Sequence, residues 1–98
     1  MPHLIWNKSA LRDLQRCYNF LAMKNPAAAS RAVQSIREGI KIVIVHPGAG
    51  RMVDKMDASF REWIIRFGDG GYIVRYRLRG GQIIVVAVKH QREGRSQS

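Results

Sequence analysis

The sequence predicts a small α+β domain in which a helical hairpin packs on a small, mainly antiparallel, twisted sheet, in the order β-α-α-β-β-β. Three observations lead to this fold class. Apolar residues recur every three or four positions in the first half of the chain, as in helices. After about residue 59 they alternate with a period of two, as in strands. Short glycine-rich turns separate these later strands, and such turns join antiparallel neighbours.

The N-terminal half is expected to hold a short strand and two helices. Leu4–Trp6 is the predicted strand, and Ser9–Met23 carries apolar residues at helical spacing. Asn25-Pro26 suits the start of the second helix, because asparagine caps a first turn and proline there lacks only an N–H that would be unpaired anyway. This helix is expected to run to His46-Pro47. The short connection makes the two helices antiparallel.

The C-terminal half is expected to form a loop followed by three strands. The loop starts at Pro47 and runs to about Ser59. The predicted strands are Phe60–Phe67, Tyr72–Leu78 and Gln82–Lys89, joined by turns at 68–71 and 79–81. Residues 92–98 are predicted to be a loose tail, and residues 1–98 are predicted to form one domain.

The composition is unusual in its large excess of positive charge. The chain has 17 Lys and Arg against 7 Asp and Glu, a net charge of +10. A protein this basic attracts polyanions or an acidic protein partner. Arginine outnumbers lysine, which favours bidentate contacts with carboxylate or phosphate groups.

A candidate basic surface follows from the alternation in the second C-terminal strand. Tyr72, Val74 and Tyr76 should face the helices, which puts Arg75 and Arg77 on the other face. The predicted target-binding surface consists of Arg75, Arg77, Lys89, His90 and Arg92, with Arg66 as a further candidate. A plain solvated sheet face, kept soluble by its charges, is the alternative interpretation.

Several classes of function are disfavoured by what the sequence lacks. A single cysteine, Cys17, gives no disulfide framework and no cysteine-based zinc site, and it is expected to be a small buried residue. The three histidines lack metal-ligand spacing, so neither a metal nor a cofactor is expected. The longest apolar run is far shorter than the roughly 20 residues that cross a bilayer. We therefore expect no membrane association and a cytoplasmic location.

Ordered sequence motifs resemble a known family. They are Ala10-Leu11-Arg12-Asp13-Leu14, Asn25-Pro26-Ala27-Ala28-Ala29, Pro47-Gly48-Ala49-Gly50-Arg51, Phe60-Arg61-Glu62-Trp63, Phe67-Gly68, Gly71-Tyr72, Tyr76-Arg77 and His90-Gln91-Arg92-Glu93. Together they cover nearly the whole chain and resemble the RelE/ParE superfamily of type II toxin–antitoxin toxins, most of all its ParE (plasmid stabilisation) branch.

The resemblance implies a microbial-RNase-like β-α-α-β-β-β fold and a cognate antitoxin that wraps the toxin with an acidic or amphipathic segment. It also implies one of two targets. ParE-like toxins poison DNA gyrase, whereas RelE-like toxins cut mRNA in the ribosomal A site. In either case a toxin–antitoxin hetero-oligomer is expected.

The RelE-type catalytic set is depleted in this chain. By resemblance, that set has two lysines on the strand before the Gly-Tyr, an arginine directly after the Gly-Tyr, an arginine in the closing motif and a tyrosine downstream. Here Ile64 and Arg66 replace the lysines, Ile73 replaces the first arginine, Arg92 is kept, and the tail has no tyrosine. Arginine stabilises phosphate charge but does not readily transfer protons.

The sequence therefore predicts a ParE-like gyrase inhibitor without catalytic residues, neutralised by its antitoxin. Phe60, Arg61 and Trp63 are the predicted antitoxin-binding residues. The alternative is a ribosome-dependent mRNA endonuclease in which His90 transfers protons and Arg66 and Arg92 hold phosphate. A simple nucleic-acid-binding module is a further alternative, and it would show steep salt dependence.

Overall fold

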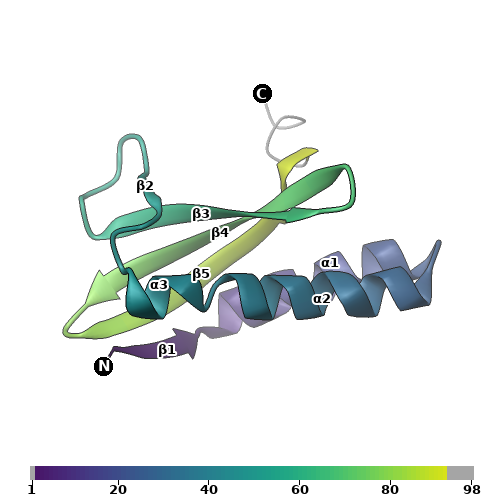
Figure 1. Ribbon diagram of the computed structural model, residues 1–98, viewed down its shortest axis with the longest axis horizontal. Coiled ribbons are helices and arrows are strands. Elements are labelled where there is room, and N and C mark those ends of the chain that lie inside the picture. Colours follow the sequence, from purple (N-terminus) through teal and green to yellow (C-terminus); the bar gives the residue numbers. More distant parts are fainter. Residues whose placement is uncertain (1, 93–98) are drawn as a thin grey trace.

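The computed structural model describes residues 2–92 and has two layers. A helical hairpin covers one face of a mixed five-stranded sheet, and Figure 1 shows the two long helices side by side along that sheet. The elements are β1 (His3–Trp6), α1 (Lys8–Ala22), α2 (Pro26–Gly39), α3 (Ile42–Val45), β2 (Arg51–Met52), β3 (Phe60–Phe67), β4 (Gly70–Arg79) and β5 (Gln82–His90). The predicted α+β class and the order of the six predicted elements are confirmed, and the structure adds the short elements α3 and β2.

Asparagine side chains cap the N-termini of both long helices. Asn7 Oδ1 accepts a hydrogen bond from the Ala10 N–H at 2.8 Å, and Asn25 Oδ1 accepts one from the Ala28 N–H at 3.1 Å. Each bond satisfies one of the N–H groups that a first helical turn leaves unpaired. Pro26 occupies the first position of α2, as predicted.

The second predicted helix is divided in two. α2 ends at Gly39, and α3 begins only at Ile42. Glycine weakens a helix at this point, and the Gly39 carbonyl instead accepts a hydrogen bond from Trp63 Nε1 at 3.2 Å. The prediction of one continuous helix to His46 was therefore wrong, although Val43 in α3 still packs into the core.

The sheet order is β1-β5-β4-β3-β2. β3, β4 and β5 form the expected antiparallel meander, whereas β1 pairs in parallel with β5. The prediction that the segment 47–59 is entirely a loop is wrong, because Arg51–Met52 pairs with β3 as the short edge strand β2. The first hairpin turn is also shorter than predicted, because β4 already begins at Gly70.

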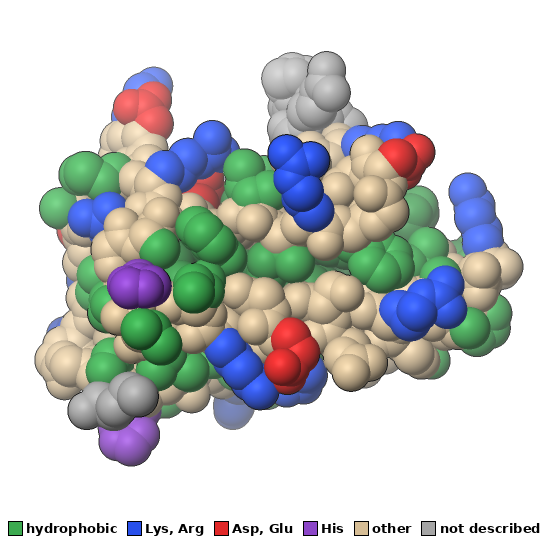
Figure 2. Space-filling view, viewed as in Figure 1, with side chains coloured by type: hydrophobic (Ala, Val, Ile, Leu, Met, Phe, Trp, Pro, Cys, Tyr) green, Lys and Arg blue, Asp and Glu red, His purple; other side chains and the backbone are tan. Residues whose placement is uncertain are grey.

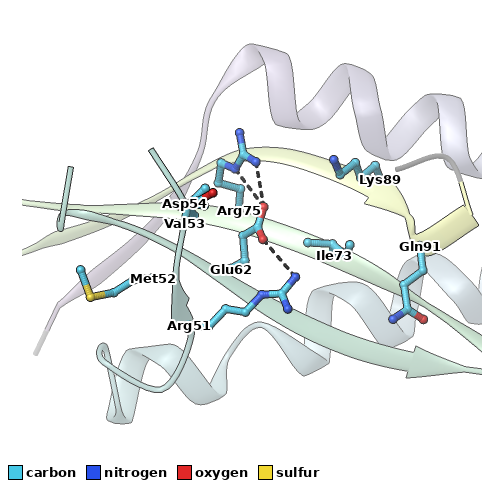
Figure 3. A pocket seen from close by; sticks show the side chains of 9 residues that line it. All are labelled: Arg51, Met52, Val53, Asp54, Glu62, Ile73, Arg75, Lys89 and Gln91. Atoms are coloured by element: carbon cyan, nitrogen blue, oxygen red, sulfur yellow. Dashed lines mark hydrogen bonds and ion pairs between the residues drawn. The ribbon is translucent and has the colours of Figure 1, made fainter. Parts of the chain in front are cut away.

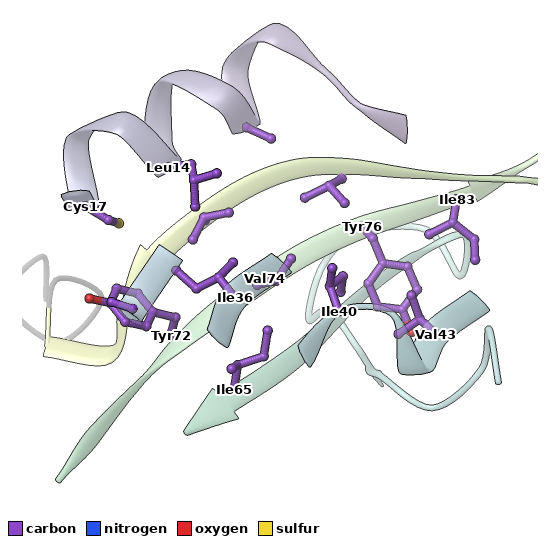
Figure 4. Close-up of a cluster of buried hydrophobic side chains, with 14 residues drawn as sticks. Leu14, Cys17, Ile36, Ile40, Val43, Ile65, Tyr72, Val74, Tyr76 and Ile83 are labelled. Carbon is purple, nitrogen blue, oxygen red and sulfur yellow. The ribbon is translucent and has the colours of Figure 1, made fainter. Parts of the chain in front are cut away.

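The core lies between the helices and one face of the sheet (Figure 4). It contains Leu14, Ile36, Val74 and Tyr76, which the periodicities predicted to be buried, and Cys17 is 7% exposed as expected. Leu11, which belongs to the same predicted helical face as Leu14, is instead 44% exposed. The face of β4 that carries Tyr72, Val74 and Tyr76 is buried, which confirms the predicted orientation of this strand.

One irregularity in β5 decides where its last residues point. Arg75 pairs with Ala87 and Tyr76 pairs with Val85, so Val86 is an extra residue in the ladder. Such a bulge interrupts the strict alternation of a strand. Val85 and Val88 are consequently both buried, although three positions separate them.

Candidate functional site: two surfaces on opposite sides of the sheet

The face of the sheet away from the helices is called here the open face. Arg75, Arg77 and Lys89 lie on it, because they alternate with buried residues of β4 and β5. Arg77 stacks over the Phe60 ring with its guanidinium carbon 4.8 Å from the ring centroid, and its Nε donates to Ser59 Oγ at 3.2 Å. Arg77 is thus held in place by a neighbouring aromatic side chain.

Glu62 neutralises part of the charge on the open face. Its Oε2 accepts hydrogen bonds from Arg75 Nε at 3.2 Å and Nη2 at 2.8 Å, and its Oε1 lies 3.4 Å from Arg51 Nη2 (Figure 3). The Glu62 side chain is only 10% exposed. Two guanidinium groups therefore share one nearly buried carboxylate.

The ion-paired group forms one wall of a hollow on the open face. This open-face hollow has a volume of about 550 Å³. Its lining residues are Arg51, Met52, Val53, Asp54, Glu62, Ile73, Arg75, Lys89 and Gln91. In Figure 3, Ile73 lies between Glu62 and the end of β5 that carries Lys89. Cations and apolar side chains thus border the same depression.

His90 lies on the helix side of the sheet. It pairs with Tyr72 in the ladder, and the two rings meet edge to face with centroids 5.2 Å apart. The His90 Nδ1 accepts a hydrogen bond from the Arg92 backbone N–H at 3.1 Å. Because of the bulge at Val86, Lys89 turns to the open face and His90 to the helices.

A second hollow, the helix-side groove, lies between the end of α1 and the β3–β4 turn. Its volume is about 640 Å³. Its lining residues are Arg16, Cys17, Phe20, Leu21, Lys24, Phe67, Gly68, Asp69, Gly70, Tyr72, His90 and Arg92. Phe20 contributes a side chain that is 71% exposed. The lining of this groove is more apolar than that of the open-face hollow, and positively charged side chains also border it.

The predicted basic surface is therefore two surfaces. The structure brings Arg75, Arg77 and Lys89 together on the open face, and it places His90 and Arg92 at the helix-side groove. Figure 2 shows Lys and Arg side chains spread over the visible face without one common patch. The expectation of a single stripe fails because consecutive residues of a strand point to opposite faces.

The residues of the nuclease alternative are likewise divided. Arg66 follows Glu62 and Ile64 on the open face of β3 and is exposed. His90 and Arg92 line the helix-side groove. The three side chains thus face different sides of the sheet.

The predicted antitoxin-binding residues also separate. Phe60 lies on the open face under Arg77. Arg61 and Trp63 point to the other face, where Arg61 Nη1 donates to the carbonyls of Gly50 at 2.9 Å and Gly48 at 3.3 Å. Within the chain, Arg61 therefore anchors the loop before β2, and Trp63 caps α2.

Glu62 and Arg51, which form the ion-paired group with Arg75, are among the lining residues of the open-face hollow that were not predicted from the sequence. The sequence of the β3–β4 turn contains a signal for the pairing of Glu62. A two-residue Gly68-Asp69 turn, in which Gly68 has the positive φ of 61°, sets a register that pairs Glu62 with Arg75. The sequence contains no comparable signal for Arg51, because the position of Arg51 depends on the path of the loop before β2.

The pKa values of two groups are shifted, one in the loop before β3 and one in the core. A hydrogen bond from the Ser59 hydroxyl lowers the pKa of Asp57, and the Ser59 backbone N–H and nearby Arg77 act in the same direction. Burial raises the pKa of Tyr76, whose hydroxyl donates to the Pro47 carbonyl at 2.8 Å and accepts from the Gly50 N–H at 2.9 Å. Tyr76 thereby holds the loop that leads to Arg51.

Neither hollow has the ligand set of a metal centre. Across residues 2–92, the structure contains no group of three or more His, Cys, Asp or Glu side chains arranged to hold a metal ion. None of the helices in the same part of the chain is long and apolar enough to cross a membrane.

Comparisons with known proteins agree with the fold and with the motifs. The family model for the ParE toxin of type II toxin-antitoxin system, parDE, matches residues 4–94. Two relatives from Caulobacter vibrioides are Toxin RelE3, 29% identical with 88% of this chain and 90% of the relative covered, and Toxin RelE1, 33% identical with 88% and 89% covered. A solved structure of the chromosomal ParDE TA system from P. aeruginosa has a TM-score of 0.73 at 25% identity, covering 92% of this chain and 96% of that one. The chain belongs to the ParE toxin family of type II toxin–antitoxin systems, within the RelE/ParE superfamily.

Proposed function

We propose that this toxin inhibits DNA gyrase by binding it, and that a cognate antitoxin neutralises it in a hetero-oligomeric complex in the cytoplasm. The observation that carries the proposal is the separation of Arg66 from His90 and Arg92 on opposite sides of the sheet. Phosphodiester cleavage needs a proton-transferring group and a charge clamp at the same phosphate. Binding to a target protein has no such requirement.

The residue types on the two surfaces also favour binding over catalysis. Arg75 and Arg77 are held by Glu62, Ser59 and Phe60, which fixes guanidinium groups in defined directions. Fixed arginines contribute specificity at protein interfaces and do not serve as general bases.

The test is a supercoiling assay with the antitoxin-free protein, gyrase, ATP and relaxed plasmid. We expect supercoiling to be inhibited and cleaved DNA to accumulate. Protein that is folded by circular dichroism, binds its antitoxin and leaves gyrase unaffected would contradict the proposal.

Matched double variants then locate the target-binding surface. Arg77→Gln with Lys89→Gln removes two charges from the open face, and Lys24→Gln with Arg92→Gln removes two from the helix-side groove. Arg12→Gln with Arg31→Gln removes two exposed charges from the helices and is the control. We expect one of the first two pairs to raise the inhibitory concentration about tenfold or more, and the control to change it less than twofold. Equal effects of all three pairs would show that only net charge matters.

The second candidate is a ribosome-dependent mRNA endonuclease. Two observations favour it: His90 and Arg92 meet at one groove, and relatives that align with most of the chain bear the name RelE. In this case His90→Ala would abolish cleavage of ribosome-bound mRNA while folding and antitoxin binding remain. Growth arrest that is unchanged by His90→Ala would argue against it.

A further inference from the structure

The open-face hollow contains more positive donor groups than Glu62 engages. Arg75 uses Nε and Nη2 on Glu62, but Arg51 reaches the same carboxylate with Nη2 alone, at 3.4 Å. The Arg51 side chain is 62% exposed, whereas that of Arg75 is 30% exposed. Arg75 is thus the fixed cation of the hollow, and Arg51 is a loosely held one.

A third cation, Lys89, lies across the hollow from the two arginines. Lys89 lines it from β5, and Ile73 lies in the ladder directly beside Lys89. Figure 3 shows Arg51 and Lys89 entering the hollow from different strands, on either side of Ile73. An anionic group above Ile73 would therefore meet Arg51 from one side and Lys89 from the other.

The surroundings favour a carboxylate over a nucleic-acid backbone. Asp54 also lines the hollow together with Glu62, so three cations face two carboxylates. A nucleic acid presents a phosphate at every step and depends on several cationic contacts, which these carboxylates oppose. Apolar Ile73 and Met52 in the same lining suit the side chains that flank an acidic residue in a polypeptide.

We propose that the open-face hollow binds a carboxylate side chain of an acidic, partly apolar polypeptide segment. Arg51 leaves or shares its weak contact with Glu62 and turns to the incoming carboxylate, and Lys89 binds it from the other side. Arg75 stays on Glu62 and keeps the wall of the hollow in place. This inference goes beyond the proposed function, because it names the chemistry of one ligand site whichever protein supplies the segment.

The experiment uses the full-length protein and a fluorescein-labelled octapeptide of alternating glutamate and leucine. The matched probe has glutamine in place of each glutamate, and a labelled oligothymidylate of eight nucleotides is the nucleic-acid probe. Fluorescence anisotropy at about 0.1 M salt measures Kd for each probe. We expect the glutamate peptide to bind about tenfold or more tightly than the glutamine peptide.

Single variants test the two predicted contacts. Arg51→Gln and Lys89→Gln should each weaken binding of the glutamate peptide about fivefold or more, since each removes a charge-assisted contact. Arg31→Gln removes the same charge from an exposed position on α2 and should change Kd less than twofold. Unfolding midpoints of all variants verify that each is folded.

Three results would overturn the proposal. The glutamine peptide could bind as well as the glutamate peptide, Arg31→Gln could weaken binding as much as Arg51→Gln, or the oligonucleotide could bind more tightly and lose affinity with Arg51→Gln. The last result would assign the hollow to phosphate. None of these measurements involves gyrase, so failure of this site is distinct from failure in the supercoiling assay.

Discussion

The two hollows lie on opposite faces of the same sheet and differ in what holds them together. The open-face hollow is organised by ion pairs among Arg51, Glu62 and Arg75. The helix-side groove is organised by packing, with Tyr72 4% exposed beneath it and Phe67 and His90 against the Tyr72 ring. Alternation along a strand gives neighbouring residues different surroundings, so residues one position apart contribute to surfaces of different chemistry.

The largest expected effect comes from removing the packed ring of the helix-side groove. Tyr72→Ala should lower the free energy of unfolding by about 3 kcal/mol, because a buried ring is replaced by a cavity. Urea unfolding followed by circular dichroism measures the change. Tyr72→Phe keeps the ring and is the control, with an expected loss of about 1 kcal/mol or less. A small loss for Tyr72→Ala would mean that packing does not hold this groove together.

A smaller effect is expected from the ion-paired group of the open face. Glu62→Gln leaves Arg75 and Arg51 without their shared carboxylate and should cost about 2 kcal/mol. Salt screens the exposed Arg51 more than the nearly buried pair of Glu62 and Arg75, so about 1 M NaCl should reduce this cost only in part and leave that of Tyr72→Ala unchanged. A double-mutant cycle with Arg75→Gln isolates the pair. Zero coupling energy would contradict the role given to Glu62.

Tyr76 links the two sides, because its ring is in the core and its hydroxyl holds the loop before Arg51. At pH 7, Tyr76→Phe should lower the free energy of unfolding by about 1 kcal/mol, because the substitution removes the hydrogen-bond partner of the Gly50 N–H and the Pro47 carbonyl. The pKa of Tyr76 is raised above its ordinary value of 10.0, so its contribution is present below pH 10 and declines as the pH rises toward the higher folded value. The wild-type advantage over Tyr76→Phe should shrink in this range. A stability advantage of the wild type that grows as the pH rises would contradict this prediction.

The smallest effect on stability is expected at the mouth of the helix-side groove. Phe20 is 71% exposed, so Phe20→Ser should change the free energy of unfolding by no more than about 0.5 kcal/mol. If the groove is a binding surface, the same substitution should weaken antitoxin or gyrase binding, because exposed aromatic side chains contribute strongly to interfaces. Isothermal titration with each partner measures this. Unchanged affinity for both partners would remove Phe20 from the interfaces.

Local patterns predicted the elements well. The alternation in β4 identified its buried face, and Asn25-Pro26 located the start of α2. The helical spacing in α1 identified its buried face only in part, because Leu14 is buried but Leu11 is exposed. The end of α2 was missed, since the same apolar spacing continues through Ile40 and Val43 while the backbone turns between them. A spacing reports which side chains are buried and does not report whether the helix is continuous between them.

The candidate site was less predictable than the elements. Arg75, Arg77 and Lys89 were correctly grouped on one face, but His90 and Arg92 were added to them. Consecutive strand residues point to opposite faces, and the bulge at Val86 decides that Lys89 lies on the open face and His90 on the helix side. No turn or periodicity in the sequence indicates this bulge. Glu62 was absent from the predicted site, because its contact with Arg75 depends on the hairpin register.

The sequence alone determines the α+β class, the order of the elements, the buried face of β4 and the excess of positive charge, because these depend on residues close together in the chain. Only the tertiary structure decides that β1 joins β5 in parallel, that Glu62 pairs with two arginines and that the basic residues divide between two surfaces. These features depend on strand register and on contacts between distant segments, where a shift of one residue reverses the face on which every side chain lies.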